Sequence, residues 1–227
     1  MRSITPELLD LLPADDPRAI TSRRDLQRIN FVIRQQAIMA RSLSVCAQPR
    51  VLVDMGSGDG RFLLGVSKRL AKPWPGVRVL LADQQDIVSS KTREKFASFG
   101  WSCESLVGDV FDSLARLGSG ADIITANLFL HHFDDIALAK LLAVVKESCR
   151  SFVACEPHRS LLALIGGKMV FALGCNGVTR HDTVASVRAG FRSKELSALW
   201  PQDGQWKLHE SSAFPFSHVF TAVKHAG

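Results

Sequence analysis

The chain has 227 residues, 46% of them hydrophobic and 22% charged, and its 28 basic and 22 acidic residues give a formal charge of +6. This length predicts one domain with a core of its own, and the composition excludes a disordered chain, a collagen-like repeat and a disulfide scaffold. No apolar run reaches the roughly 18 residues that a membrane span needs.

The ends of the chain carry the basic excess, which lies in residues 1–50 and 158–227 and forms no dense run. This pattern is typical of solvated helix faces and does not favour a nucleic-acid partner. The N-terminus is acidic and lacks the apolar stretch of a secretory signal, and the five cysteines form no C-x-x-C pair. We therefore expect a reduced, cytoplasmic protein with no disulfide framework and no metal site.

The first fifth of the chain is predicted to be helical. Apolar side chains recur at helical spacing over residues 22–44, which predicts one helix within an N-terminal helical cap, residues 1–49. From residue 50 onwards short apolar runs alternate with helical segments. The predicted strands are 51–56, 77–83, 105–110, 121–129 and 152–157, and the predicted helices are 61–71, 86–99, 112–117 and 135–149. Continuous apolar strands are typical of a parallel sheet covered on both faces.

Residues 159–190 interrupt this alternation with a mostly helical insertion, which is either a lid over the substrate or a plain buried helix hairpin. After a helix over 193–200, the strands 206–214 and 218–225 lie so close that they must be antiparallel. The predicted fold is α/β, a Rossmann-like three-layer sandwich. Its mostly parallel seven-stranded sheet ends in an antiparallel C-terminal hairpin, and residues 50–227 form its domain.

The first two strands end in residues suited to binding a nucleoside. In open parallel sheets, ligands bind beyond the carboxyl ends of the strands. Asp54 ends the first strand, and the turn that follows consists of Gly56, Ser57, Gly58, Asp59 and Gly60. Alternate glycines let the backbone approach a ligand closely. The second strand ends at Asp83, whose carboxylate can accept both hydroxyl groups of a ribose.

The charge around the glycine turn indicates which nucleoside cofactor binds. Asp54 and Asp59 flank the turn. Each carboxylate would repel a pyrophosphate by about 1 kcal/mol even in a wet site, and each would attract an ammonium or sulfonium group. The turn therefore favours S-adenosyl-L-methionine over a dinucleotide.

The segments DMGSGDG, LLAD, GDVF and TANLFLHHF resemble, in order, the motifs of class I S-adenosylmethionine-dependent methyltransferases over about residues 50–157. This resemblance implies an enzyme of EC 2.1.1 with S-adenosyl-L-methionine as its cofactor. The cofactor-binding residues that it implies are Asp54, Gly56, Ser57, Gly58, Gly60, Asp83, Gln84, Asp109, Val110, Asn127 and Leu128. Asp109 would accept from the adenine amino group, and the alternative is that it simply caps the helix over 112–117.

Methylation of a phenol or an enol needs a general base, usually a histidine. The preferred candidate is His181, which lies in the insertion beside Asp182. His158 follows the fifth strand near Glu156, and His132 follows the fourth strand. The alternative for each is a structural histidine that is buried or solvated.

The fourth-strand motif bears on the substrate. Methyltransferases acting on exocyclic amines typically carry Asn/Asp-Pro-Pro-aromatic, whereas this chain has NLFL over 127–130, which disfavours a nucleic-acid substrate. The segments GVTRHDTVASVRAGF and RRDLQRINF resemble bacterial methyltransferases encoded beside polyketide synthases. That resemblance implies that Arg28 and Asn30 close over the cofactor, and that Arg180, His181 and Arg188 face a small-molecule substrate.

The sequence thus predicts methyl transfer to a hydroxyl group of a phenolic, quinone or polyketide-like metabolite. The alternatives are an RNA or protein methyltransferase, an NAD-dependent oxidoreductase on the same sheet, and a binding module without catalysis. The methylated atom and the oligomeric state are not fixed by the sequence.

Overall fold

The computed structural model describes residues 2–169 and 174–225. Seven strands form one sheet in the order β3-β2-β1-β4-β5-β7-β6, and only β7 runs antiparallel to its neighbours β5 and β6. The strands are β1 (Val51–Met55), β2 (Arg78–Asp83), β3 (Ser102–Val107), β4 (Ile123–Asn127), β5 (Ser151–Pro157), β6 (Trp206–Ala213) and β7 (Ser217–Lys224). This arrangement confirms the predicted fold class.

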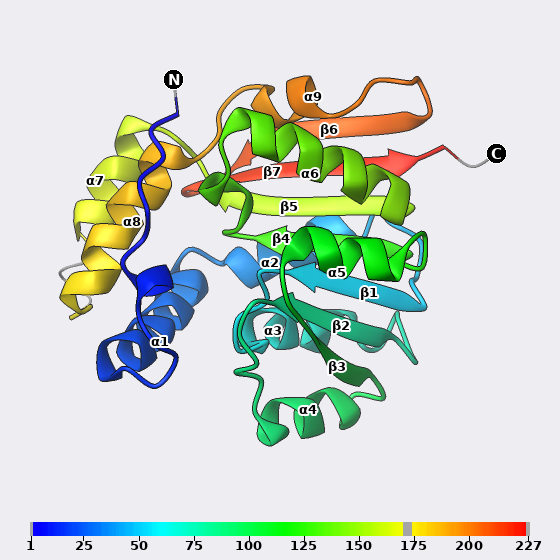
Figure 1. Ribbon diagram of the computed structural model, residues 1–227, viewed down its shortest axis with the longest axis horizontal. Helices are drawn as coiled ribbons and strands as arrows, with labels where there is room; N and C mark the ends of the chain where they lie inside the picture. Colours follow the sequence, from blue (N-terminus) through cyan, green and yellow to red (C-terminus); the bar gives the residue numbers. More distant parts are fainter. Residues whose placement is uncertain (1, 170–173, 226–227) are drawn as a thin grey trace.

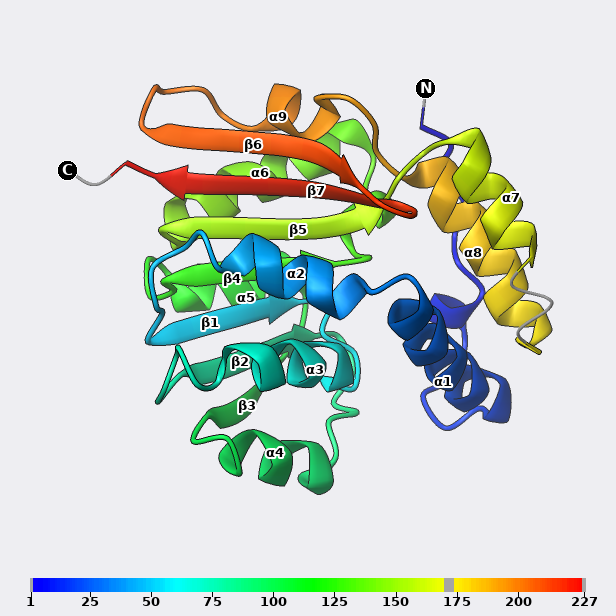
Figure 2. The same ribbon diagram turned by 180° about the vertical axis from the view of Figure 1, so that it is seen from behind.

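Helices cover both faces of the sheet (Figures 1 and 2). One face carries α2 (Gln35–Leu43), α3 (Arg61–Leu70) and α4 (Ser90–Ala97). The other carries α5 (Val110–Leu117), α6 (Asp135–Ser148) and α9 (Glu195–Leu199). Each face has its own apolar core, and each core holds two buried tryptophans: Trp74 and Trp101 on the α2–α3 side, Trp200 and Trp206 on the other.

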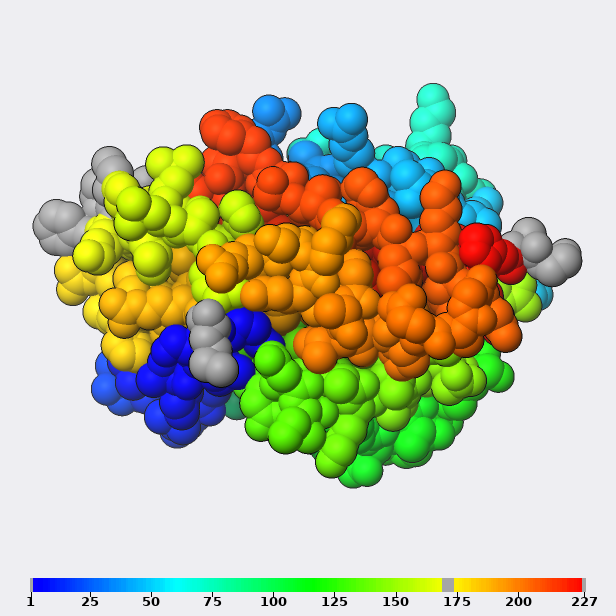
Figure 3. Space-filling model, turned by 90° about the horizontal axis from the view of Figure 1, so that it is seen from above, coloured from blue at the N-terminus to red at the C-terminus, as the bar shows by residue number. Residues whose placement is uncertain are grey.

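Three helices gather beyond the carboxyl ends of the parallel strands (Figure 1). They are α1 (Pro17–Val32), α7 (Leu161–Met169) and α8 (Gly177–Ala189). The N-terminal segment, residues 2–16, contains the 3₁₀ helix η1 (Leu9–Leu11) and lies at the surface between α8 and the start of α6 (Figure 3). A second 3₁₀ helix, η2 (Leu130–His132), follows β4. These helices and the N-terminal segment surround the edge of the sheet at which the parallel strands end. We call this part of the molecule the walled end.

Two predicted elements differ most from the structure in their bounds. The single helix predicted over 22–44 is two helices, because Arg34 adopts a left-handed conformation with φ of 58° between α1 and α2. The third strand was predicted over 105–110 but occupies Ser102–Val107, and α5 begins at Val110. The insertion is helical as predicted, although residues 170–173 of it lie outside the described residues.

The N-terminal part does not stand apart from the sheet. Met39 and Leu43 of α2 are fully buried against β-strand residues such as Leu52. The apolar packing is thus continuous across residue 49. The division of the chain into a cap and a methyltransferase domain at that residue stays a prediction. Across residues 2–169 and 174–225, no helix combines the length and the apolarity that crossing a membrane requires.

Candidate functional site

The glycine turn between β1 and α3 has the backbone geometry that its sequence predicts. Gly56, Gly58 and Gly60 have φ values of 65°, 54° and 72°, the left-handed region in which glycine is favoured. A Cβ atom on Gly56 would lie 2.3 Å from Cδ2 of Phe129, whereas nothing lies within 4 Å of one on Gly58. The turn is thus packed tightly on one side and open at its tip.

Asp83 lies over this turn at the end of β2. Its Oδ2 accepts from the backbone N–H of Gly58 at 2.8 Å, and its Oδ1 accepts from that of Gln85 at 3.0 Å. The first two strands therefore bring the glycine turn and the carboxylate together, while Gln84 is exposed beside them.

Asp54 lies beneath the turn and is only 2% exposed. Its Oδ1 accepts from the hydroxyl of Thr125 on the adjacent β4 at 2.7 Å. Burial raises the pKa of Asp54 to about 7, against the opposing effect of the Thr125 hydrogen bond. A positive group placed at the turn would favour the ionised form of this carboxyl.

The residues around the turn fit a ligand that carries hydrogen-bond donors. Ser57 Oγ and Asn30 Oδ1 are buried and, among the described residues, have no hydrogen-bond partner. Asn30 lies one turn of α1 beyond Gln27, whose Nε2 donates to Asp59 at 3.1 Å. Buried polar atoms without partners are costly unless a ligand or water satisfies them. Of the two, Ser57 lies in the turn itself, where a donor group of a ligand would satisfy its oxygen.

The remaining predicted cofactor residues lie along the same edge of the sheet. Asp109 caps α5 by accepting from the N–H of Phe111 at 2.8 Å, and Val110 is buried as the first residue of that helix. Asn127 ends β4, where its Oδ1 accepts from Gln35 Nε2 at 3.2 Å. Leu128 follows with a φ of 53° and faces a cavity. Capping by Asp109 was one of the two alternatives for that residue.

This cavity of about 390 Å³ lies between the sheet edge and the helices α1, α7 and α8. Its walls are mostly apolar and include Leu26, Ile29, Leu128, Ala163, Val187 and Phe216. Three carboxylates, those of Glu7, Glu156 and Asp182, also reach it. Such a chamber suits an apolar molecule that offers a few polar atoms.

His131 lies buried between two of these carboxylates. Its Nδ1 is 2.8 Å from Oε2 of Glu156, and its Nε2 is 3.1 Å from Oε1 of Glu7. Burial opposes a charge on this ring, but the hydrogen bonds to Glu156 and Glu7 raise the pKa of His131 to about 9. Burial alone would raise the pKa of Glu7, but its interactions with His131 and His132 outweigh burial and hold that pKa well below the usual range. A carboxylate–histidine pair thus adjoins the cavity.

None of the three predicted bases lines the cavity, and neither does His131, although Glu7 and Glu156 beside it do. The His181 side chain is 48% exposed on α8 and pairs with Asp182 at 2.9 Å. His158 stacks on His218, and burial together with that neighbour lowers its pKa. His132 contacts the carbonyl of Phe129 through Nδ1 at 2.9 Å. The catalytic role of each stays a prediction.

The predicted arginines also occupy the walled end. Arg28 on α1 lies 3.4 Å from Asp25, and Arg180 and Arg188 are on exposed positions of α8. Sequence reasoning missed Glu7 and Gln35, and of the two histidines that follow the fourth strand it favoured His132 over His131. His131 is next to His132, and Glu156 was considered only as a neighbour of His158. Knowing that strands β4 and β5 pair would have indicated that His131 and Glu156 meet.

Comparisons with known proteins agree with this geometry. The family model for the O-methyltransferase domain matches residues 10–168. The malonyl-[acyl-carrier protein] O-methyltransferase of Xylella fastidiosa is 30% identical over 88 residues, which make up 39% of this chain and 28% of that protein. The aligned region is thus under a third of that relative's length.

Solved structures show the same fold at low sequence identity. An O-methyltransferase family protein from Burkholderia thailandensis superposes with a TM-score of 0.64 at 17% identity, covering 94% of this chain and 62% of that one. The plantazolicin methyltransferase BamL, solved with SAH, gives a TM-score of 0.64 at 12% identity over 95% of this chain and 92% of its own. Because the family model covers more than half of the chain, this protein belongs to the O-methyltransferase domain family, whose methyl donor is S-adenosyl-L-methionine.

Proposed function

We propose that this protein transfers a methyl group from S-adenosyl-L-methionine to a hydroxyl group of a small, largely apolar metabolite of the phenolic, quinone or polyketide-like kind. The observation that carries this proposal is the apolar cavity of about 390 Å³ with the Glu156–His131 pair behind its wall. An apolar cavity of this size suits a small molecule better than a strand of RNA or a protein surface.

Different residues at the sheet edge would bind the methyl donor and the methyl acceptor. The cofactor supplies an electrophilic methyl group on a sulfonium. Asp83 holds the ribose, and the turn 56–60 with Ser57 and Asn30 receives the methionine end. In-line displacement then depends mainly on alignment within a dry pocket.

His131 is the proton acceptor in this proposal. Once Glu7 has withdrawn and the ring is neutral, Nε2 of His131 would take the proton of the substrate hydroxyl as that oxygen is methylated. Glu156 holds the ring through Nδ1 and stabilises its positive charge. Glu7 occupies the place of the hydroxyl 3.1 Å from Nε2, so it must withdraw when the substrate enters.

The test is His131→Asn, assayed with labelled S-adenosyl-L-methionine on a panel of phenols, quinols, amines and thiols. Turnover on the best hydroxyl acceptor should fall by about 10²–10⁴-fold, with affinity for S-adenosylhomocysteine unchanged. His209→Asn, at an exposed position on β6, is the matched control.

His181→Asn and His158→Asn belong in the same series. If turnover collapsed in one of these variants and survived in His131→Asn, the base would be that residue instead. If the unaltered enzyme methylated RNA or protein but none of the small acceptors, the substrate class proposed above would be wrong.

A further inference from the structure

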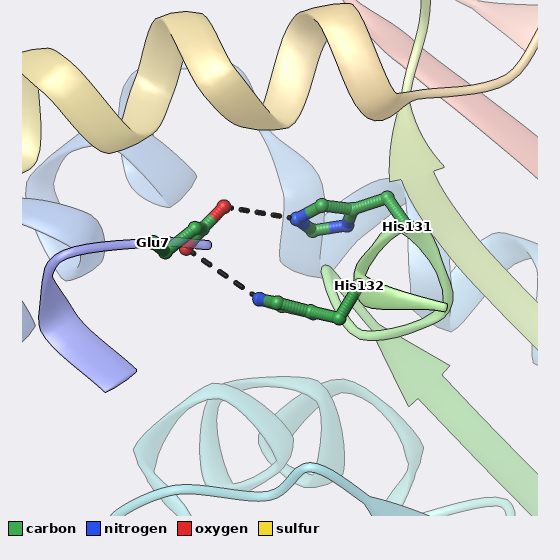
Figure 4. Close-up of side chains that lie close together, drawn as sticks. All are labelled: Glu7, His131 and His132. Atoms are coloured by element: carbon green, nitrogen blue, oxygen red, sulfur yellow. Dashed lines mark hydrogen bonds and ion pairs between the residues drawn. The ribbon is translucent and has the colours of Figure 1, made fainter. Parts of the chain in front are cut away.

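Glu7, His131 and His132 bring three metal-ligating groups together although Glu7 is 124 residues away from His131 in sequence. One ligand atom from each lies within 4.8 Å of the other two. Figure 4 shows the Glu7 carboxylate directed at both rings, one oxygen toward each. Glu7 comes from the N-terminal segment, and both histidines come from η2.

The hydrogen bonds of the two rings fix which nitrogen carries the proton. Nδ1 of His132 lies 2.9 Å from the carbonyl oxygen of Phe129, which can only accept, so this nitrogen donates. Nδ1 of His131 faces Glu156, whose other oxygen accepts from the N–H groups of Phe129 and Leu130, the bonding of an ionised carboxylate. Each ring, when it is neutral, therefore has its lone pair on Nε2.

Both Nε2 atoms face the carboxylate of Glu7. The distances are 3.1 Å from His131 to Oε1 and 3.6 Å from His132 to Oε2. Nε2 of His132 is buried and, within the described residues, has no hydrogen-bond partner. In the metal-free protein a proton on Nε2 of His131 bonds that ring to Glu7 and leaves Nε2 of His132 without a partner in the part of the chain that the structure describes. Protons on both rings would put two like charges on ring centres only 4.3 Å apart, whereas one divalent cation satisfies all three groups.

The spacing fits coordination by a single ion. Tetrahedral bonds of about 2.0–2.2 Å place neighbouring ligand atoms about 3.3–3.5 Å apart. Asp10 offers a fourth oxygen 3.4 Å from Nε2 of His132, and its side chain is 58% exposed, which leaves a path from solvent. Glu156 and the Phe129 carbonyl orient the rings from behind, as outer partners do in metal sites.

We propose that Glu7, His131 and His132, with Asp10 as the fourth ligand, bind one divalent transition-metal ion of the zinc class. Two imidazole ligands favour zinc, cobalt or nickel over magnesium or calcium. The ion would fasten the N-terminal segment onto η2 and so keep the cavity closed on that side. If the proposed function holds, the ion also competes with the substrate hydroxyl for Nε2 of His131 and inhibits methyl transfer.

The test is titration of the chelator-treated full chain with Co²⁺, followed by visible absorption, and with Zn²⁺, followed by calorimetry. We expect one ion per chain, the intense d–d bands of tetrahedral Co²⁺, and a rise in melting temperature with Zn²⁺. Glu7→Gln and His132→Asn should each weaken binding by more than about tenfold, the equivalent of one lost ligand bond. His209→Asn is the matched surface control.

Weak octahedral Co²⁺ spectra, or binding that Glu7→Gln and His132→Asn leave intact, would overturn the site. If Glu7→Gln failed to fold, Asp10→Asn at its exposed position would report instead, through a weaker affinity and an altered Co²⁺ spectrum. Tight binding without inhibition of methyl transfer would support the metal site and count against His131 as the base, so the two proposals fail separately.

Discussion

The carboxyl group of Asp54 lies beneath the glycine turn with the Thr125 hydroxyl as its partner, and burial raises its pKa to about 7. An unfolded aspartate titrates near about 3.9. Between these two values the folded chain holds a proton that the unfolded chain has lost. This residue therefore lowers the free energy of unfolding as the pH rises from about 4 to about 7.

Asp54→Asn removes this titration. In the absence of cofactor, the variant should gain stability relative to the unaltered protein between pH 5 and pH 8, as measured by urea unfolding at both values. Its affinity for the positively charged S-adenosyl-L-methionine should fall, because the amide carries no charge. An equal difference in stability at both pH values would show that Asp54 is ionised in the folded protein throughout.

Asp83 gives the second prediction at this scale. Asp83→Ala should weaken binding of S-adenosylhomocysteine by about 1.5–3 kcal/mol, the value of a hydrogen bond to a charged group. Calorimetric titration measures it, and Asp86→Ala, at an exposed position three residues later, is the control. Unchanged affinity in Asp83→Ala would remove the ribose assignment.

Residue types and their place after a strand were enough to predict that Asp54, the glycine turn and Asp83 lie together, because the rule for ligands at strand ends is local. Glu7 could not be found in this way. It meets His131 only because the N-terminal segment folds back to η2, and nothing in the sequence near either residue encodes that contact. Buried pairs of distant origin need the tertiary structure.

At the scale of elements, two glycines of the turn allow the backbone strain of an added side chain to be distinguished from its steric clash. Gly56→Ala should lose more stability than Gly58→Ala, since both have positive φ but only the first would place a Cβ 2.3 Å from the Phe129 ring. The backbone strain common to both is about 1–2 kcal/mol. Thermal unfolding of the two variants side by side measures the difference, and equal losses would mean that Phe129 moves aside freely.

The strands and most helices followed from apolar runs and helical spacing. The break at Arg34 did not, because arginine is a good helix former and neither glycine nor proline marks the position. The third strand was displaced for a related reason. In SCESLV, at the sheet edge, exposed residues are interspersed with partly buried ones, so its apolar signal is weak. The predicted strand was therefore placed too far along the chain and ended at Val110.

At the scale of the whole molecule, Arg2 fastens the N-terminal segment across the walled end. Its guanidinium donates to Asp135 at 2.8 Å and to the carbonyls of Ala189 and Phe133, and it lies 4.2 Å above the ring of Phe191. Further along, the N–H groups of Leu8 and Leu9 donate to Asp182.

Arg2→Ala should therefore loosen the segment as a unit. We expect faster hydrogen exchange at the amides of Leu8 and Leu9, with little change in the exchange of the sheet, because local opening costs less than global unfolding. Arg18→Ala, which removes an exposed ion pair with Asp16, is the control. Unaltered protection at Leu8 and Leu9 would show that Glu7 and Asp182 hold the segment without Arg2.

The positions of the four tryptophans decide which optical signal can be used with this protein. All four are buried in the two layers that flank the sheet, and none lines the cavity described above. The chain contains no tyrosine. Intrinsic fluorescence should therefore emit at short wavelength and report melting of the two layers, while remaining nearly silent to occupancy of the chamber. Ligand screening accordingly needs calorimetry, a radiolabelled ligand or an added fluorophore.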